Sequence, residues 1–209
     1  INLHDLIVRY GKIVDLNVDE VLCKFNLAAT VHLILSESLI GCFELIDHAL
    51  LDFKFVLCEK PISTTLEDAQ TISNEIAAKE AKTGKRQVVF GFMRRFDPSF
   101  IKMRDLINSG KYGKALFLRV VSRNTNSGGI ISSGLFTNIA IHDFDIYRWM
   151  FQSEWESVTP FYPNAISNGP EGLKDPLVFI AKLKNGVVMV EDVVANASYG
   201  YDTRAEVVC

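Results

Sequence analysis

The sequence has few of the features that mark membrane, secreted or zinc-binding proteins. No CxxC pair occurs and the cysteine spacings match no zinc site, so no metal is expected. The longest apolar stretch, 33–51, is interrupted by Glu37, Glu44 and Asp47, whereas a membrane span needs about 20 mostly apolar residues. No secretory signal opens the chain, and scattered cysteines favour a reducing, cytoplasmic location. The four cysteines are Cys23, Cys42, Cys58 and Cys209.

The sequence also lacks a large net charge of either sign. The 209 residues include 25 Asp and Glu against 22 Lys and Arg, a net charge of −3. A chain this close to neutral carries no basic stripe for nucleic acid and no polybasic patch for a membrane surface. The 48% apolar content excludes a disordered chain, which combines low hydrophobicity with high net charge. Composition therefore predicts a folded protein with neither a nucleic acid nor a membrane as its partner.

The glycine pattern of a dinucleotide-binding turn is missing as well. No G-x-G-x-x-G occurs, and only Gly11 and Gly41 precede residue 84. The chain begins at Ile1 and stops at Cys209, directly after a strand-like segment at 204–208. We therefore expect a fragment that is truncated at both ends and lacks the pyrophosphate-binding turn.

Apolar periodicity divides the chain into two halves. The first alternates strands with helices, which predicts a parallel sheet of βαβ units. The second predicts two helices and several strands, two of them joined as a hairpin by Lys184-Asn185-Gly186. We expect an α/β chain with an incomplete Rossmann-type domain over 1–92 and an α+β domain with a mostly antiparallel open sheet over 93–209. The predicted strands are 12–17, 54–58, 87–92, 116–123, 158–162, 177–183, 187–195 and 204–208, and the predicted helices are 19–25, 43–51, 65–82, 97–108 and 137–150.

Two candidate site segments follow predicted strands of the first half. Glu59-Lys60-Pro61 comes after the strand at 54–58, and ligands of open parallel sheets bind beyond the carboxyl ends of the strands. A lysine there can reach a substrate oxygen; a solvated lysine beside a turn proline is the alternative. Asp15 lies near the end of the strand at 12–17, where a carboxylate can accept hydrogen bonds from an adenosine ribose. A plain turn or cap residue is the alternative for Asp15.

A third candidate lies on the predicted helix at 137–150. Asn138, His142 and Asp145 are four and three residues apart, so they share one face of an α-helix. A histidine with polar neighbours is a candidate general base, because its unperturbed pKa is about 6.5. The alternative is structural, with Asn138 as a helix cap and with Asp145 and Arg148 as surface ion-pair partners.

Arg94 and Arg95 form a fourth candidate, between a strand and a helix. Arginines in that position can orient an oxygen-rich substrate or a phosphate. The structural alternative is that they pair with Asp97 or Glu59.

Together these segments resemble the glucose–fructose oxidoreductase, inositol 2-dehydrogenase and MocA (Gfo/Idh/MocA) family. The resemblance runs in order over residues 10–209, weakly over 27–42, and is nearest to the myo-inositol 2-dehydrogenases. EKP, FMRRFDPSF and IHDFD are highly specific as a set. The matching segments are VDLN at 14–17, FELIDHAL at 43–50, VLCEKPISTTLEDA at 56–69, VVFGFMRRFDPSF at 88–100, SGKYGKALFLRVVSRN at 109–124, SGLFTNIAIHDFDIYRWM at 133–150 and YGYDTRAEV at 199–207.

The resemblance implies an enzyme that uses NAD or NADP to oxidise a secondary alcohol of a cyclic polyol or sugar. It implies that Lys60 holds the reacting hydroxyl and that His142 is the acid and base. It also implies a homo-oligomer through the C-terminal sheet. Carried over position by position, the catalytic residues are Lys60, His142 and Asn138, the cofactor-binding residues are Asp15, Glu59, Lys60, Pro61 and Arg94, and the substrate-binding residues are Lys60, Arg94, Asn138, His142, Tyr199 and Tyr201.

Departures from the family pattern keep other interpretations open. Asn138 stands where dehydrogenases of the family usually carry Asp, and 36–42 lacks the A-T-P-type loop that lies against the cofactor. A non-catalytic relative that has lost cofactor binding, and that serves as a binding or oligomerisation module, fits these departures. A faulty gene model around 27–42 is a third explanation.

Overall fold

The computed structural model describes residues 31–34, 55–63, 65–86, 88–126, 128–130, 132–167 and 169–209. The chain divides into two compact units, residues 1–91 and residues 92–209. The predicted strand at 12–17, the predicted helices at 19–25 and 43–51, and the segment 36–42 lie outside the described residues.

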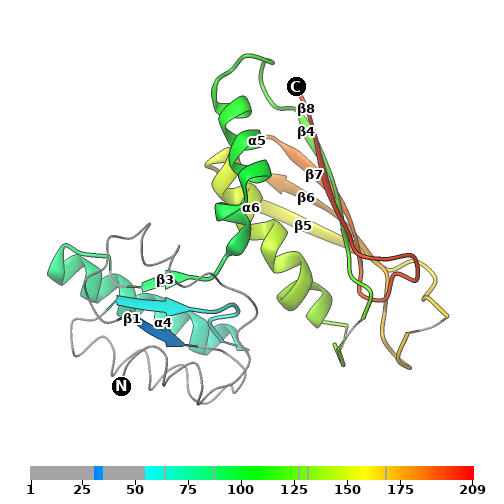
Figure 1. Cartoon of the computed structure of the whole chain (residues 1–209), viewed down its shortest axis with the longest axis horizontal. Coiled ribbons are helices and arrows are strands. Elements are labelled where there is room, and N and C mark those ends of the chain that lie inside the picture. Colours follow the sequence, from blue (N-terminus) through cyan, green and yellow to red (C-terminus); the bar gives the residue numbers. More distant parts are fainter. Residues whose placement is uncertain are drawn as a thin grey trace. The chain divides into compact units, whose positions relative to one another are not determined.

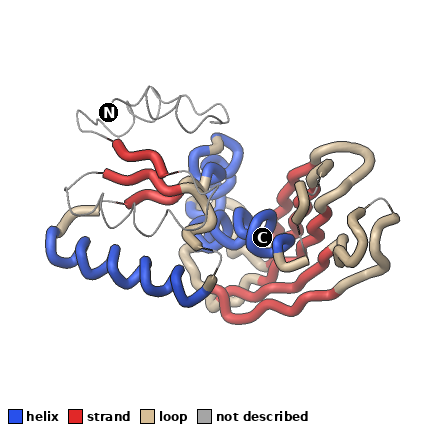
Figure 2. The backbone as a smooth tube through the Cα atoms, turned by 90° about the horizontal axis from the view of Figure 1, so that it is seen from below, coloured by secondary structure: helices blue, strands red, loops and turns tan. Residues whose placement is uncertain are grey.

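Three parallel strands form the sheet of the first unit. They are β1 (Val31–Ile34), β2 (Phe55–Cys58) and β3 (Val88–Phe90), in the order β1-β2-β3. Helix α4 (Leu66–Thr83) runs along one face of this sheet (Figure 2). The parallel sheet that the alternation of strands and helices predicted is thus confirmed. The core between the helix and the sheet contains Val56, Cys58, Ile72, Ile76 and Val88.

Helix α4 forms where the sequence predicts it, because a start signal precedes it and a stop signal follows it. The Thr65 hydroxyl oxygen accepts a hydrogen bond from the Asp68 amide at 3.2 Å, which satisfies one of the free N–H groups of the first turn. Ile72 and Ile76, four residues apart, are buried against the sheet. Gly84 ends the helix with a φ of 67°, a left-handed conformation that glycine adopts without strain.

The second unit has a five-stranded sheet in the order β5-β6-β7-β4-β8. Only the β4–β7 pair within this sheet is parallel, so the predicted mostly antiparallel sheet is confirmed. Lys184-Asn185-Gly186 joins β6 to β7, with Gly186 at a φ of 93°, as the hairpin signal predicted. The elements are η1 (Met93–Phe96), α5 (Pro98–Asn108), β4 (Phe117–Arg123), η2 (Leu135–Ala140), α6 (Ile141–Phe151), β5 (Trp155–Phe161), β6 (Leu177–Leu183), β7 (Val188–Val194) and β8 (Asp202–Val208).

Helices α5 and α6 cover one face of the five-stranded sheet, and no helix of the described residues covers the other (Figure 1). Alternate strand residues therefore differ in burial: Phe179 and Met189 face the helices and are buried, whereas Ile180 and Val190 face away and are exposed. We refer to the face without helices as the open face. The helix-covered face carries the main hydrophobic core of this unit.

The segment before α6 differs from the prediction. A continuous α-helix was expected over 137–150, but η2 is a π-helix, and α-helical geometry begins only at Ile141. A π-helix closes its hydrogen bonds over five residues instead of four, so it changes the residue spacing along a face. Apolar periodicity does not reveal such a local change of pitch. Among the described helices, we find none that combines the length and apolar character needed to span a membrane.

Candidate functional site

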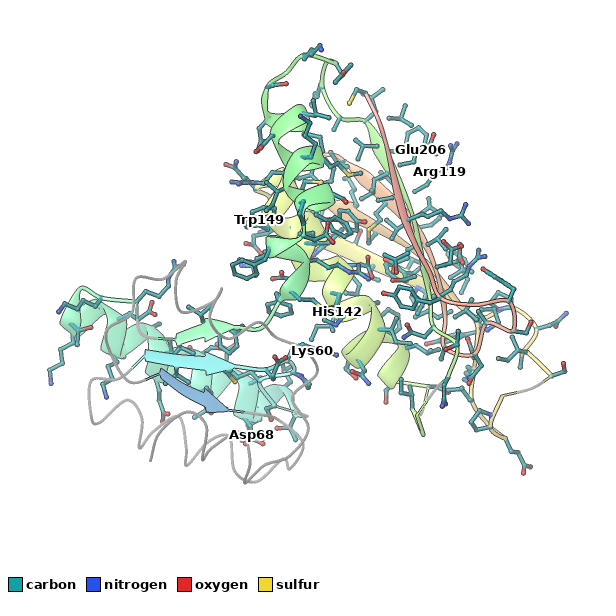
Figure 3. All side chains as sticks on the ribbon, in the orientation of Figure 1. Lys60, Asp68, Arg119, His142, Trp149 and Glu206 are labelled. Carbon is teal, nitrogen blue, oxygen red and sulfur yellow. The ribbon has the colours of Figure 1, made fainter. Side chains whose placement is uncertain are left out.

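Lys60 lies directly beyond the carboxyl end of β2, the middle strand of the parallel sheet (Figure 3). The sheet continues past the strand ends, since the Gly91 amide donates to the Cys58 carbonyl at 2.7 Å. Glu59, Lys60 and Pro61 are all half-buried. Burial lowers the pKa of the Lys60 ammonium, and the neighbouring Glu59 opposes that shift. Burial likewise raises the pKa of Glu59, opposed by Lys60. The edge of the sheet thus holds a partly desolvated acid and base side by side.

Gly91 gives the Glu59 carboxyl the space that it occupies. A Cβ atom at position 91 would lie 2.8 Å from Oε2 and 2.9 Å from Oε1 of Glu59. These separations are shorter than van der Waals contact, so any larger residue would displace the carboxyl group. The Glu59 carboxyl after β2 therefore fits against the chain after β3 only because residue 91 is a glycine.

Arg94 connects η1 to α6 in the second unit. Its Nη1 donates to Oδ1 of Asp143, and its Nη2 donates to Oγ of Ser122 at 3.2 Å. Ser122 in turn donates to Oδ2 of Asp143 at 2.9 Å. All three side chains are buried. Burial raises the pKa of Asp143, whereas the charge of Arg94 lowers it. Both terminal nitrogens of the Arg94 guanidinium thus have partners inside this unit.

Arg95 makes a second connection between the same elements. Its Nε donates to Oδ2 of Asp145 at 2.7 Å, and its Nη2 to the other carboxylate oxygen, a two-bond fork. Asp145 is only 8% exposed.

The structural alternatives proposed for these residues are wrong in their pairings. Arg94 and Arg95 pair with Asp143 and Asp145, not with Asp97 or Glu59. Asp97 instead caps α5, since its Oδ1 accepts from the Ser99 amide at 2.7 Å.

The alternative that made Asp145 and Arg148 surface ion-pair partners is right for Arg148 and wrong for Asp145, which is buried. Asp145 is taken up by Arg95, while Arg148 donates to Glu154 at 2.8 Å. Asp145, on the buried side of α6, thus pairs with η1, and Arg148, on the exposed side, pairs with the chain just after the helix.

His142 and Asn138 lie on either side of the change in helical pitch. His142 is half-buried in the first turn of α6, and Asn138 is exposed within η2. The expectation that both share a face assumed α-helical spacing throughout, so the π-helical segment alters that argument. His142 directly precedes Asp143, and Arg94 therefore holds the turn that carries the histidine.

Tyr199 and Tyr201 follow β7 and are both exposed. The Tyr199 hydroxyl meets Nη1 of Arg123, whose Nε donates to Asp192. Both hydrogen bonds raise the pKa of Arg123, and the one with Asp192 contributes most. Arg123 and Asp192 alternate with the buried Ser122 and Glu191, so they lie on the open face. The structure thus brings Tyr199 to the open face, whereas His142 lies on a helix that covers the other face.

Glu191 is a buried acid that sequence reasoning missed. It is 0% exposed and stands between Met189 and Val193 on the helix-covered side of β7. The alternation in VVMVEDVV was the available signal, because it places an acid in register with core residues. Asp143 was missed too, although it follows His142 directly.

The remaining predicted residue, Asp15, lies outside the described residues. Lys60, Glu59 and Pro61 belong to the first unit, and Arg94, Asn138, His142, Tyr199 and Tyr201 belong to the second. Within the described ranges, no group of three or more His, Cys, Asp and Glu side chains gathers as metal ligands.

Comparison with known proteins assigns the chain to a family. Residues 100–209 match the GFO/IDH/MocA C-terminal domain. This match covers more than half of the chain, which therefore belongs to the Gfo/Idh/MocA family. The resemblance stated from the sequence is confirmed, as is the mixed α/β fold.

Several of the similar proteins are named as inositol dehydrogenases. Inositol 2-dehydrogenase 2 of Saccharopolyspora erythraea is 36% identical over 156 residues, 74% of this chain and 45% of that protein. Inositol 2-dehydrogenase of Corynebacterium glutamicum is 37% identical over 154 residues, 73% of this chain and 44% of that protein. The crystal structure of myo-inositol dehydrogenase from Lactobacillus casei with NAD(H) and myo-inositol has a TM-score of 0.77 at 27% identity, covering 91% of this chain and 60% of that one. The chain thus spans less than half the length of the curated relatives it matches.

Proposed function

We propose that this chain belongs to an oxidoreductase that transfers a hydride between NAD or NADP and a secondary alcohol of a cyclic polyol or sugar, as inositol 2-dehydrogenases do. The observation that carries the proposal is the half-buried Lys60 beyond the carboxyl end of β2, where ligands of open parallel sheets bind. Lys60 and His142 stand in segments that resemble the family, and His142 lies within the matched residues 100–209. The names of the similar proteins support the substrate class, and the Lactobacillus casei structure supports NAD as cofactor.

The first unit is the dinucleotide-binding part of this proposal. Ligands of open parallel sheets bind beyond the carboxyl ends of the strands, and the half-buried Glu59-Lys60-Pro61 lies at that edge. A partly desolvated ammonium beside an acid suits a hydroxyl-rich ligand, because it offers both a donor and an acceptor. The proposed cofactor-binding residues are Asp15, Glu59, Lys60, Pro61 and Arg94.

The chemistry assigns one task to each catalytic side chain. NAD(P), when bound, supplies the hydride acceptor. The Lys60 ammonium donates a hydrogen bond to the reacting hydroxyl and stabilises negative charge on its oxygen. The His142 imidazole accepts the hydroxyl proton, since a neutral imidazole is a base near neutral pH. Asn138 orients the ring without adding charge. The resemblance also assigns substrate contacts to Arg94, Tyr199 and Tyr201, but the Arg94 guanidinium is already bound by Asp143 and Ser122, and Tyr199 lies on the open face.

The open face of the C-terminal sheet supports self-association. Ile180 and Val190 are paired in register on β6 and β7, and both are more than 40% exposed. Phe161 of β5, 51% exposed, pairs with Val178 on the same face. A second copy packed on this face would remove apolar surface from water. The proposed partner there is another molecule of this protein.

The test compares Lys60→Ala with Lys82→Ala, which changes an exposed lysine of α4. We expect Lys60→Ala to lower kcat with NAD and myo-inositol by about 10²–10³-fold, the usual effect of removing one charge-stabilising donor. NAD affinity, measured by equilibrium binding, stays close to that of the unchanged protein, and Lys82→Ala behaves like the unchanged protein in both assays. An equal loss of NAD binding would instead assign Lys60 to cofactor binding or to folding.

Asn138 favours a second candidate, a relative that binds but does not catalyse. A carboxylate at this position would raise the basicity of His142, and an amide does not. The same assay separates the two candidates. Binding of NAD and inositol without turnover supports the second, and measurable turnover by the unchanged protein rejects it.

A further inference from the structure

Glu191 lies in the middle of the five-stranded sheet, on the face that α6 covers. It is 0% exposed, and its partners in register, Val120 of β4 and Phe179 of β6, are buried and apolar. No amide, guanidinium or hydroxyl donor of the described residues reaches either carboxyl oxygen of Glu191. A carboxylate buried without donors is strongly unfavourable in its ionised form.

The carboxyl of Asp143 lies on the same side of the sheet, because Ser122, which donates to it, follows two residues after Val120, the partner of Glu191 in register on β4. Ionised carboxylates offer acceptors only, so a hydrogen bond between these two acids requires a proton on one of them. Arg94 and Ser122 each donate to one oxygen of Asp143. Asp143 is therefore the anion that its surroundings stabilise, and the proton belongs on Glu191.

The charges around the pair agree with one shared proton. Arg94 is the one permanent cation that the described residues place against it. Two ionised acids opposite one cation would leave a net negative charge in the core, whereas a single proton makes the group neutral. Asp192 lies on the open face, paired with Arg123. The titratable or charged groups next to the pair are Arg94 of η1, His142 and Tyr147 of α6, and Asp192 of β7.

We propose that Glu191 holds a proton at neutral pH and donates it to Asp143, so that one proton connects β7 to the start of α6. This connection goes beyond the proposed function, which assigns no task to either acid. If that function holds, Glu191 and Asp143 are positioning residues for His142, which precedes Asp143 on α6. Burial raises the pKa of both acids, that of Glu191 well above its ordinary value, in agreement with the geometry.

The first test is infrared spectroscopy of the full 209-residue chain at pH 7, without cofactor or substrate. A protonated carboxylic acid has a C=O stretching band that ionised carboxylates lack. We expect this band in the unchanged chain and its loss in Glu191→Gln. The control, Glu154→Gln, changes an exposed acid and keeps the band. Absence of the band, or its survival in Glu191→Gln, overturns the proposal.

The second test is the pH dependence of urea unfolding. An acid whose pKa is raised by folding stabilises the protein below its unfolded pKa, about 4.3 for Glu, and this contribution is lost as pH rises through the folded pKa. The urea midpoint of the unchanged chain should therefore fall as pH rises above about 5, and that of Glu191→Gln should fall less.

Both tests keep the proposal separate from the hydride-transfer function, since neither involves turnover. A Gln side chain is neutral, close in shape to a protonated Glu, and able to donate to Asp143. Glu191→Gln should therefore fold, and its failure to fold while Glu154→Gln folds would show that position 191 requires a charge. Equal pH slopes in Glu191→Gln and the unchanged chain would likewise contradict the proposal.

Discussion

The buried pair of Arg94 and Asp143 offers a sharp test of what holds α6 in place. Arg94 is 8% exposed and Asp143 is 0% exposed. Arg94→Met keeps much of the side-chain volume but removes the charge and both hydrogen bonds. Breaking a buried ion pair from one side costs about 3–5 kcal/mol, because the other charge is left in the core without compensation. We therefore expect Arg94→Met to lower the free energy of unfolding of the C-terminal unit by that amount.

Arg119 provides the matched control within the same sheet. It donates to Glu206 at 2.9 Å, and both side chains are 61% exposed on the open face (Figure 3). An exposed pair of this kind contributes only about 0.2–1 kcal/mol. Arg119→Met should therefore change stability several-fold less than Arg94→Met, although each variant removes one arginine and one ion pair.

Tryptophan fluorescence during urea unfolding measures this unit alone. The two tryptophans of the chain, Trp149 and Trp155, both lie in the C-terminal unit. Trp149 is part of α6, and the Trp155 indole donates to the Phe144 carbonyl of the same helix at 3.0 Å. Their signal therefore follows the attachment of α6 to the sheet.

The pH dependence of Arg94→Met has a definite sign. Arg94 lowers the pKa of Asp143 in the folded protein, so its removal lets burial raise that pKa further. An acid with a raised folded pKa loses its stabilising contribution as pH rises above its unfolded value of about 3.9. The deficit of Arg94→Met should thus be small near pH 4 and grow toward pH 8. Equal losses in Arg94→Met and Arg119→Met, or a deficit that shrinks with rising pH, would refute this reasoning.

Two further substitutions test local features. Asp97→Ala removes the side chain that caps α5 and should cost about 1 kcal/mol in the same fluorescence assay, whereas Asp97→Asn, which can still cap, should cost less; equal losses would exclude the capping role. Gly91→Ala places a Cβ 2.8 Å from Oε2 of Glu59 and should push that carboxyl away. Because Glu59 raises the pKa of Lys60 against the effect of burial, the Lys60 pKa, measured by NMR titration, should fall; an unchanged value would show that Glu59 has not moved.

The parts of the fold that the sequence predicts well depend on neighbours close in the chain. Thr65 and Asp68 cap α4, Asp97 caps α5, and Gly186 closes the hairpin, each within a few residues. These signals are local because a cap or a turn is satisfied by its own segment. The strands follow from their alternation with helices and from their own apolar character.

The ion pairs could not be predicted in the same way. Arg94 and Asp143 are 49 residues apart in the chain, and Arg95 and Asp145 are 50 apart. Nearer acids, such as Asp97, were available as partners, and only the packing of η1 against α6 decides between them. The change of pitch at η2 was hidden for a related reason, since side-chain periodicity does not encode which carbonyl each amide reaches.

The MRRF and IHDFD segments, which carry part of the resemblance to the family, contain four side chains that hold the fold. In IHDFD, Asp143 and Asp145 both face η1, where Arg94 and Arg95 of MRRF bind them. A chain that had lost its activity would still need these four residues to attach α6. Their presence therefore argues for the family fold and is neutral on catalysis. Evidence for catalysis must come from His142, directly before the first of the two structural acids, and from Lys60, beyond the carboxyl end of β2 in the other sheet.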